Sequence, residues 1–269
     1  MAFSRLQHAT QRALLVAVGL WAVGTAAWAQ DRKPVPDAAA QKRAQELLRD
    51  VYGKEYDAAK TSKQKTDLAR KLLDQAVKSQ ADPASHFVLL RVAKDVSVLA
   101  GDAETSLEAV EQIVATYDVD AMAMRLDCVK GLAAAAKFSS QHGALAEQAY
   151  LLVDVALAED DLEAADQFGE IARASAKTAR NYALLKEVVA RMKTLDQLQQ
   201  VHAEYQKALA RLDQSPTDPE ANLAAGRYLC LSRGKWDRGI PMLALGSDPA
   251  LKAPAVKELT GADSPDAQI

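Results

Sequence analysis

Apolar residues recur every three or four positions along most of the chain, which is the spacing of amphipathic helices. Pairs such as Asp82-Pro83 and Asp218-Pro219 separate these runs. They favour helix starts, because Asp accepts hydrogen bonds from the free amides of a first turn and Pro fits into that turn. No window alternates between apolar and polar residues as a strand before a hairpin turn would. The pattern therefore predicts an all-α protein.

The runs and their interruptions set the helix boundaries that we expect. Gly53 is expected to weaken the end of the first helix near Tyr52, and Gly143 is expected to break the chain between two later helices. The polar run 61–66 is either a break between two helices or a solvated turn. The expected helices cover residues 37–52, 56–80, 82–100, 107–117, 120–138, 145–157, 162–172, 178–212, 218–232, 235–245 and 248–259.

The segment 178–212 is unusually long for one helix and contains neither Gly nor Pro. Apolar residues recur through it at helical spacing, and a single helix of this length would span about 50 Å. Helices much longer than usual are typical of bridging or coiled-coil-like elements. The alternative is two helices with a turn near 193–196, but the lack of a breaker favours one.

Two expected helices near the C-terminus, 218–232 and 235–245, carry small residues where closely crossing helices need them. Gly226 lies in the first helix, Gly234 ends it, and Gly239 lies in the second. Glycine has no side chain to hold helices apart, and it readily adopts the left-handed backbone that ends a helix. We therefore expect Gly226 and Gly239 to provide the close approach of this pair.

Trp236 opens the second of these two helices. We expect it to fill the gap between the pair as a buried core residue, and the alternative is a ligand platform. This arrangement resembles a tetratricopeptide repeat, a helix-turn-helix unit that stacks into solenoids. The resemblance implies stacked helix-turn-helix pairs, a tetratricopeptide-like α-solenoid that binds or spaces other molecules.

A weaker second unit of the same kind lies earlier in the chain. Gly101 and then Ser106 stand where Gly234 and then Gly239 stand later. Its turn carries the small residue Ala103 in place of a tryptophan.

The stretch 218–252 is also similar to a recurring element of secreted proteins of planctomycete-type bacteria. The motifs that carry this similarity are Gly226-Arg227-Tyr228-Leu229-Cys230, Gly234-Lys235-Trp236 and Gly246-Ser247-Asp248-Pro249. Members of that family often continue into sugar-binding domains, which we do not expect after residue 259. The resemblance implies a helical scaffold and supplies no catalytic residues.

Residues 1–29 have the features of a secretory signal peptide. Arg5 and Arg12 precede an uncharged, mostly apolar run over 13–24, and Ala27-Trp28-Ala29 is a small-x-small cleavage site before Gln30. The run is shorter than the ~20 residues of a membrane-spanning helix, although an uncleaved anchor is the alternative. We expect export to the periplasm, the cell envelope or the extracellular space, with no stable membrane anchor after cleavage.

The rest of the chain divides by composition. Residues 30–36 are polar and contain Pro34 and Pro36, so we expect a flexible lead. A helical-repeat domain follows over 37–260, with a sub-boundary possible at the long helix. The polar tail 261–269 is expected to be disordered.

Charge and composition narrow the classes of partner. Hydrophobic residues make up 49% of the chain and charged residues 26%, as in ordinary soluble proteins. Without residues 1–29, which hold two basic and no acidic residues, 31 basic residues face 36 acidic ones, a net charge of −5. The sequence shows no basic stripe, so a nucleic-acid partner is not expected.

The residue types that carry chemistry are sparse and scattered. His86, His142 and His202 lie far apart without metal-ligand spacing, and each is expected to be a surface or capping residue. Asp160-Asp161 is expected to be a solvated helix end. Cys128 and Cys230 are either small buried hydrophobes or, in an exported protein, a disulfide pair. We expect no catalytic, metal or cofactor site.

Three functions from different classes follow from these observations. The leading hypothesis is a secreted, non-catalytic scaffold that binds a protein partner on stacked helices. The second is a structural spacer or cell-envelope module, because of the long helix 178–212. The third is an exported enzyme with a diffuse acidic site.

Overall fold

The computed structural model describes residues 32–261, and this part of the chain is all-α, with one isolated bridge in place of any strand. The proposed signal peptide and residues 262–269 of the proposed tail lie outside the described residues. The helices are α1 (Ala38–Ala58), α2 (Ser62–Lys78), α3 (Pro83–Ala100), α4 (Ala103–Thr116), α5 (Ala121–Ala135), α6 (Ser139–Ala158), α7 (Leu162–Thr178), α8 (Tyr182–Gln214), α9 (Pro219–Arg227), the π-helix η1 (Tyr228–Ser232), α10 (Trp236–Leu245) and α11 (Pro249–Gly261).

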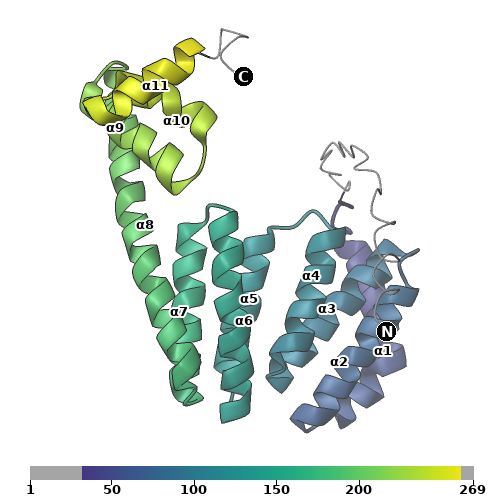
Figure 1. Ribbon diagram of the computed structural model, residues 1–269. Helices are drawn as coiled ribbons and strands as arrows, with labels where there is room; N and C mark the ends of the chain where they lie inside the picture. The colour runs from purple at the N-terminus through teal and green to yellow at the C-terminus, as the bar shows by residue number, and fades with distance from the viewer. Residues whose placement is uncertain (1–31, 262–269) are drawn as a thin grey trace, which may run out of the picture.

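The helices form a row from which one long helix projects (Figure 1). Helices α1 to α7, which we call the N-terminal stack, lie side by side with the first half of α8. Helix α8 continues past the row and carries α9, η1, α10 and α11, the C-terminal module, at its far end. The long helix expected over 178–212 is one helix of 33 residues, but it begins at Tyr182, because Thr178 ends α7 and Asn181 caps α8.

Short polar side chains define most helix starts, as the Asp-Pro pairs predict. Asp82 accepts hydrogen bonds from the amides of Ala84 and Ser85, and Asp218 accepts one from Ala221. Thr61 forms a reciprocal capping box with Gln64, so the polar run 61–66 is a break between α1 and α2.

Two larger hydrophobic cores lie in the N-terminal stack and two smaller ones in the C-terminal module, and α8 contributes to one of each. In the N-terminal stack, one core gathers around Tyr117 and Leu90, and the next gathers around Phe168. The first half of α8 contributes Val188, Met192 and Leu195 to the Phe168 core. Its second half contributes Tyr205 and Ala208 to a core of the C-terminal module. Burial of apolar surface on both halves fixes α8 to both parts of the molecule.

Two glycines that were expected to end or break helices lie inside them. Helix α1 continues through Gly53 to Ala58, and Gly143 lies in the second turn of α6. A helix-interior glycine costs only about 1 kcal/mol relative to Ala, which packing of neighbouring turns can offset. The start of α6 is set instead by Gln141, whose side-chain oxygen accepts hydrogen bonds from the amides of Lys137 and Phe138. Helix α5 accordingly ends at Ala135, before the expected position 138.

Lys33, in the segment expected to be a flexible lead, forms an isolated parallel bridge with Tyr117. Its amide donates to the carbonyl oxygen of Thr116 at 2.8 Å, and its carbonyl accepts from the amide of Asp118 at 2.9 Å. This parallel bridge holds the segment before α1 against the connection between α4 and α5.

Candidate functional site

Gly101 ends α3 in a position that excludes any side chain. Its φ of 71° lies in the left-handed region, and a Cβ atom there would lie 2.4 Å from Nε2 of Gln141. That Nε2 donates to the carbonyl oxygen of Ala100 at 2.7 Å. Gly101 therefore lets α6 approach and cap the end of α3, which is a structural role.

The crossing of α9 and η1 with α10 is as close as the two glycines predict. A Cβ on Gly226 would lie 2.9 Å from the backbone nitrogen of Leu243. A Cβ on Gly239 would lie 2.3 Å from Sγ of Cys230 and 3.1 Å from the carbonyl oxygen of Gly226. Gly234 ends the preceding helical segment with a φ of 63° and has open space around it.

Trp236 does not fill the gap between these helices, and the expectation of a buried core residue is wrong. Its side chain is 52% exposed. The physical reason is the crossing itself: contacts of Gly226 with Leu243 and of Gly239 with Cys230 bring the backbones so close that no space remains for an indole ring. Trp236 is instead a surface residue at the first position of α10.

Trp236 belongs to the connection between η1 and α10, which we call the junction turn (residues 231–238). It carries two exposed apolar residues, Leu231 at 60% and Trp236. It also carries three basic residues and one acidic residue: Arg233, Lys235, Arg238 and Asp237. The junction turn is thus a positively charged surface with an aromatic side chain.

Asp160, between α6 and α7, pairs with the junction turn. Its Oδ2 lies 3.1 Å from Nζ of Lys235, and its other oxygen contacts the guanidinium of Arg233. Asp160 has a φ of 64°, a conformation that Asp tolerates better than most residues. In residues 32–261, no other ion pair joins α9–α11 to α1–α7.

The residue before Asp160 continues the charged contacts into the stack. Glu159 accepts from Nη1 of Arg125 at 3.3 Å, and Arg125 also makes a bidentate pair with Glu111, with both distances 2.8 Å. Arg125 is 8% exposed. Its hydrogen bonds to Glu111 raise the pKa of the guanidinium, with burial opposing them. Glu159 thus joins the α6–α7 turn to charged groups on α4 and α5, while Asp160 pairs with the junction turn, so Asp160-Asp161 is more than a solvated helix end.

Sequence reasoning missed this pairing, because Asp160 and Lys235 lie 75 positions apart and neither carries a recognisable motif. One feature of the sequence indicates a separate role for Asp160. Its neighbour Asp161 already caps α7, so Asp160 is not needed as the cap.

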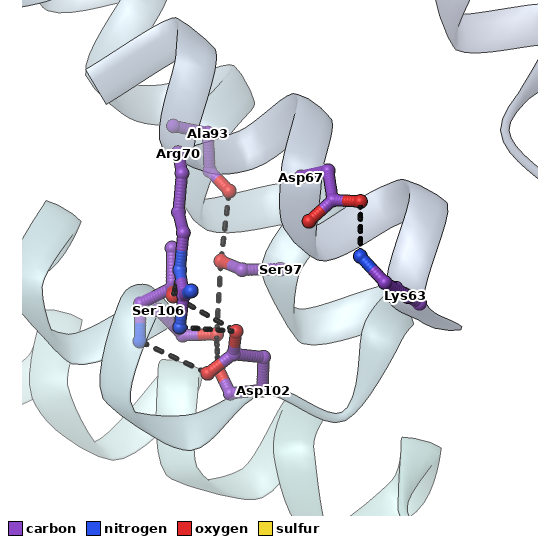
Figure 2. Close-up of polar contacts among 8 residues, drawn as sticks. Lys63, Asp67, Arg70, Ala93, Ser97, Asp102 and Ser106 are labelled. Atoms are coloured by element: carbon purple, nitrogen blue, oxygen red, sulfur yellow. Dashed lines mark hydrogen bonds and ion pairs between the residues drawn. The ribbon is translucent and has the colours of Figure 1, made fainter. Parts of the chain in front are cut away.

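A second polar cluster, at the α3–α4 turn, is structural (Figure 2). Asp102 caps α4 and faces Arg70 of α2 at 4.0 Å. Ser106 donates to the carbonyl oxygen of Asp102 at 2.6 Å and lies 3.0 Å from the hydroxyl oxygen of Ser97. These bonds satisfy buried hydroxyls where α3 and α4 cross, and they leave no group poised for chemistry.

His86 is buried, which corrects the expectation of a surface or capping residue. Tyr117 donates its hydroxyl proton to the carbonyl oxygen of Pro83 at 2.8 Å, so it accepts from Nδ1 of His86 at 2.9 Å. Burial, and then the charge of Lys33, lower the pKa of His86. Burial raises the pKa of Tyr117 to about 12. Neither group is set up to exchange protons near neutral pH.

The remaining histidines and both cysteines also lie in packing positions. His142 is half-buried in α6, and the His202 ring lies 5.5 Å from that of Tyr228. Cys128 and Cys230 are buried in separate cores, each as a free thiol. Burial raises the pKa of Cys128 to about 12, which keeps this thiol protonated and unreactive.

Neither a metal site nor a bilayer-crossing helix emerges from the described residues. In residues 32–261, no three His, Cys, Asp or Glu side chains come together as metal ligands would. Over the same residues, no helix combines the length and the apolar character needed to cross a bilayer. A small pocket between α1 and α3 is lined by Tyr56, Asp57, Ala59, Lys60, Lys65, Val96 and Leu99.

The junction turn, with Asp160, is therefore the candidate functional site. Arg233 and Lys235 provide ionic contacts there, and Leu231 and Trp236 provide exposed apolar surface. Comparison of the chain with protein-family models, curated proteins and solved structures found no match.

Proposed function

We propose that this protein is an exported, non-catalytic helical scaffold that binds a protein partner. The observation that supports this most is the exposure of Trp236 on a turn braced by the α9–α10 crossing. Residues that dominate protein–protein binding energies are enriched in Trp, Tyr and Arg. An exposed Trp beside Arg233 and Arg238 has this composition. A rigid turn also reduces the entropy lost on binding.

The stacked helix pairs support a tetratricopeptide-like α-solenoid as the architecture of the scaffold. Ser97 contacts Ser106 at the α3–α4 crossing, and Cys230 contacts Gly239 nine residues along at the η1–α10 crossing. Both pairs are separated by nine positions, and each encloses a left-handed glycine, Gly101 or Gly234. Recurrence of one plan along the chain is what a repeat architecture predicts.

Binding to immobilised full-length chain in cell-envelope extracts tests the scaffold. We expect one or a few proteins to be retained saturably, and Trp236→Ala to reduce their retention. Leu47→Ala is the matched control, because Leu47 is an apolar α1 residue that is 62% exposed and far from the junction turn in the chain. Retention that is unsaturable, or equal for both variants, would contradict a partner site at Trp236.

A structural spacer is the second candidate, and the length of α8 favours it. Its 33 residues span about 50 Å and hold the C-terminal module beyond the row of helices. A spacer predicts no saturable partner in the same extracts.

Export is proposed from the residues before Gln30. Amino-terminal sequencing of the protein from cell fractions should begin at Gln30. An intact Met1 in a membrane fraction would overturn cleavage and favour an anchor.

A further inference from the structure

The junction turn already holds a carboxylate, which indicates the chemistry that it accepts. Asp160 lies between Arg233 and Lys235, with its Oδ2 3.1 Å from Nζ of Lys235. The Arg233 side chain is 13% exposed and the Lys235 side chain is 43% exposed, so Asp160 adjoins one largely enclosed and one half-exposed cation. Arginine in such a position favours planar anions.

We propose that the junction turn binds an acidic segment of a protein partner, whose carboxylate takes the place of Asp160. This rests on the proposed scaffold function and specifies its partner. The residue bound inside the molecule is a guide to the external one: Asp160 alone contacts the junction turn, within the sequence Glu159-Asp160-Asp161-Leu162, while Glu159 pairs with Arg125 and Asp161 caps α7.

The internal contact is easily replaced. The side chains of Asp160 and Lys235 are 47% and 43% exposed, and ion pairs at such exposure contribute little net stability. A partner carboxylate regains the same attraction for Arg233 and Lys235. An apolar residue of the partner would in addition cover Trp236 and Leu231, which Asp160 leaves exposed. The exchange therefore gains apolar burial at little electrostatic cost.

Charge complementarity selects a short acidic segment over a nucleic acid. The junction turn has a net charge of +2, which matches two or three carboxylates. The full chain has a net charge of −3, and its remaining surface would repel an extended polyanion.

Displacement of Asp160 also changes the molecule. The two ion pairs of Asp160 join the α6–α7 turn to the C-terminal module. A partner that replaces them leaves α8 as the main connection between the module and the stack. Binding is therefore coupled to release of the junction.

The test uses the full chain with Trp21→Phe and Trp28→Phe, so that Trp236 is its sole tryptophan. The probe is a fluorescein-labelled synthetic peptide of residues 156–164, and the control peptide replaces every Asp and Glu by Asn and Gln. Peptide anisotropy reports binding, and Trp236 emission, measured with the unlabelled peptide, reports contact with the turn.

Asp160→Asn should bind the acidic peptide about threefold more tightly than the parent, because an internal competitor is removed. Lys235→Gln should weaken binding about threefold, and Lys252→Gln on α11 should leave it unchanged. Each variant is first checked for parental circular dichroism. Arg238→Gln is the substitute if Lys235→Gln fails this check.

Equal affinity of the parent and Asp160→Asn would overturn the proposal. So would equal binding of the neutral peptide, unchanged Trp236 emission, or preferential binding of a single-stranded oligonucleotide. If these occur while extracts still yield a saturable partner, the scaffold function stands and its site lies elsewhere. If extracts yield none as well, both proposals fail.

Discussion

At the residue scale, Gly101 and Gly234 show that one backbone conformation serves two environments. Both have a positive φ, but Gln141 fills the space beside Gly101, and the space beside Gly234 is open. Gly234→Ala should therefore cost only the left-handed strain, about 1 kcal/mol of unfolding free energy. Gly101→Ala should cost about 2 kcal/mol or more, because it also displaces the Gln141 bond to Ala100. Urea denaturation measures both, and equal costs would contradict the packing at Gly101.

His86 predicts a stability loss in mild acid. Its pKa is lowered in the folded state by burial and by Lys33, from an ordinary value of 6.5. The unfolded chain therefore binds the proton more readily, and stability should fall as pH drops below about 6.5, until the folded pKa is passed. Above 6.5 the residue is neutral in both states and has no effect. His86→Gln should reduce the change of the urea midpoint between pH 7.5 and 5 relative to the parent. An unchanged pH dependence of the midpoint would contradict this.

Trp236 should affect stability little, because it is 52% exposed. We expect Trp236→Ala to change the free energy of unfolding by about 0.5 kcal/mol or less, as surface substitutions do. Leu243→Ala, in the buried core of the same helix, should cost about 2–5 kcal/mol. A Trp236→Ala cost near that of Leu243→Ala would restore the core assignment.

At the element scale, local signals predicted helix starts and the long helix, because the groups that decide them lie within a few residues. Asp82 and Asp218 bond their own first turns, and α8 has no breaker to interrupt it. Gly53 and Gly143 led to wrong helix boundaries, because the turns on either side of a glycine can keep a helix intact. The apolar pattern does not show this contribution. The position of Trp236 was missed because exposure depends on how closely two helices cross.

The α9–α10 crossing gives an element-scale prediction. Gly239→Leu should destabilise the protein by about 1–3 kcal/mol or more, because a Cβ there already meets Cys230 at 2.3 Å. Asp237→Leu, at an exposed position of the same helix, should change stability by less than about 0.5 kcal/mol. Chemical denaturation of the two variants checks the difference, and a tolerated Gly239→Leu would contradict the close crossing.

At the scale of the whole molecule, α8 packs in both the N-terminal stack and the C-terminal module, and the ion pairs of Asp160 form a second connection between the two. The sequence predicted the elements of this arrangement and not their junction, because the pairing joins residues 75 positions apart. The candidate site was accordingly half anticipated. Trp236 and Gly234 were singled out, whereas Asp160, Arg233 and Lys235 were not.

Both proposals, the scaffold and its acidic partner, depend on the contact between Asp160 and the junction turn. A distance measurement between the N-terminal stack and the C-terminal module tests this contact most directly. Spin labels at Glu163→Cys on α7 and Lys252→Cys on α11 report the spacing of the stack and the C-terminal module by double electron–electron resonance. Both positions are exposed, and the native Cys128 and Cys230 are each 2% exposed and therefore protected from labelling.

We expect one narrow distance distribution in the parent at low salt. Asp160→Asn should broaden it, and 1 M NaCl should do the same, because salt screens exposed ion pairs. A parental distribution that is already broad, or one that stays equally narrow in Asp160→Asn, would show that Asp160 does not hold the two parts together.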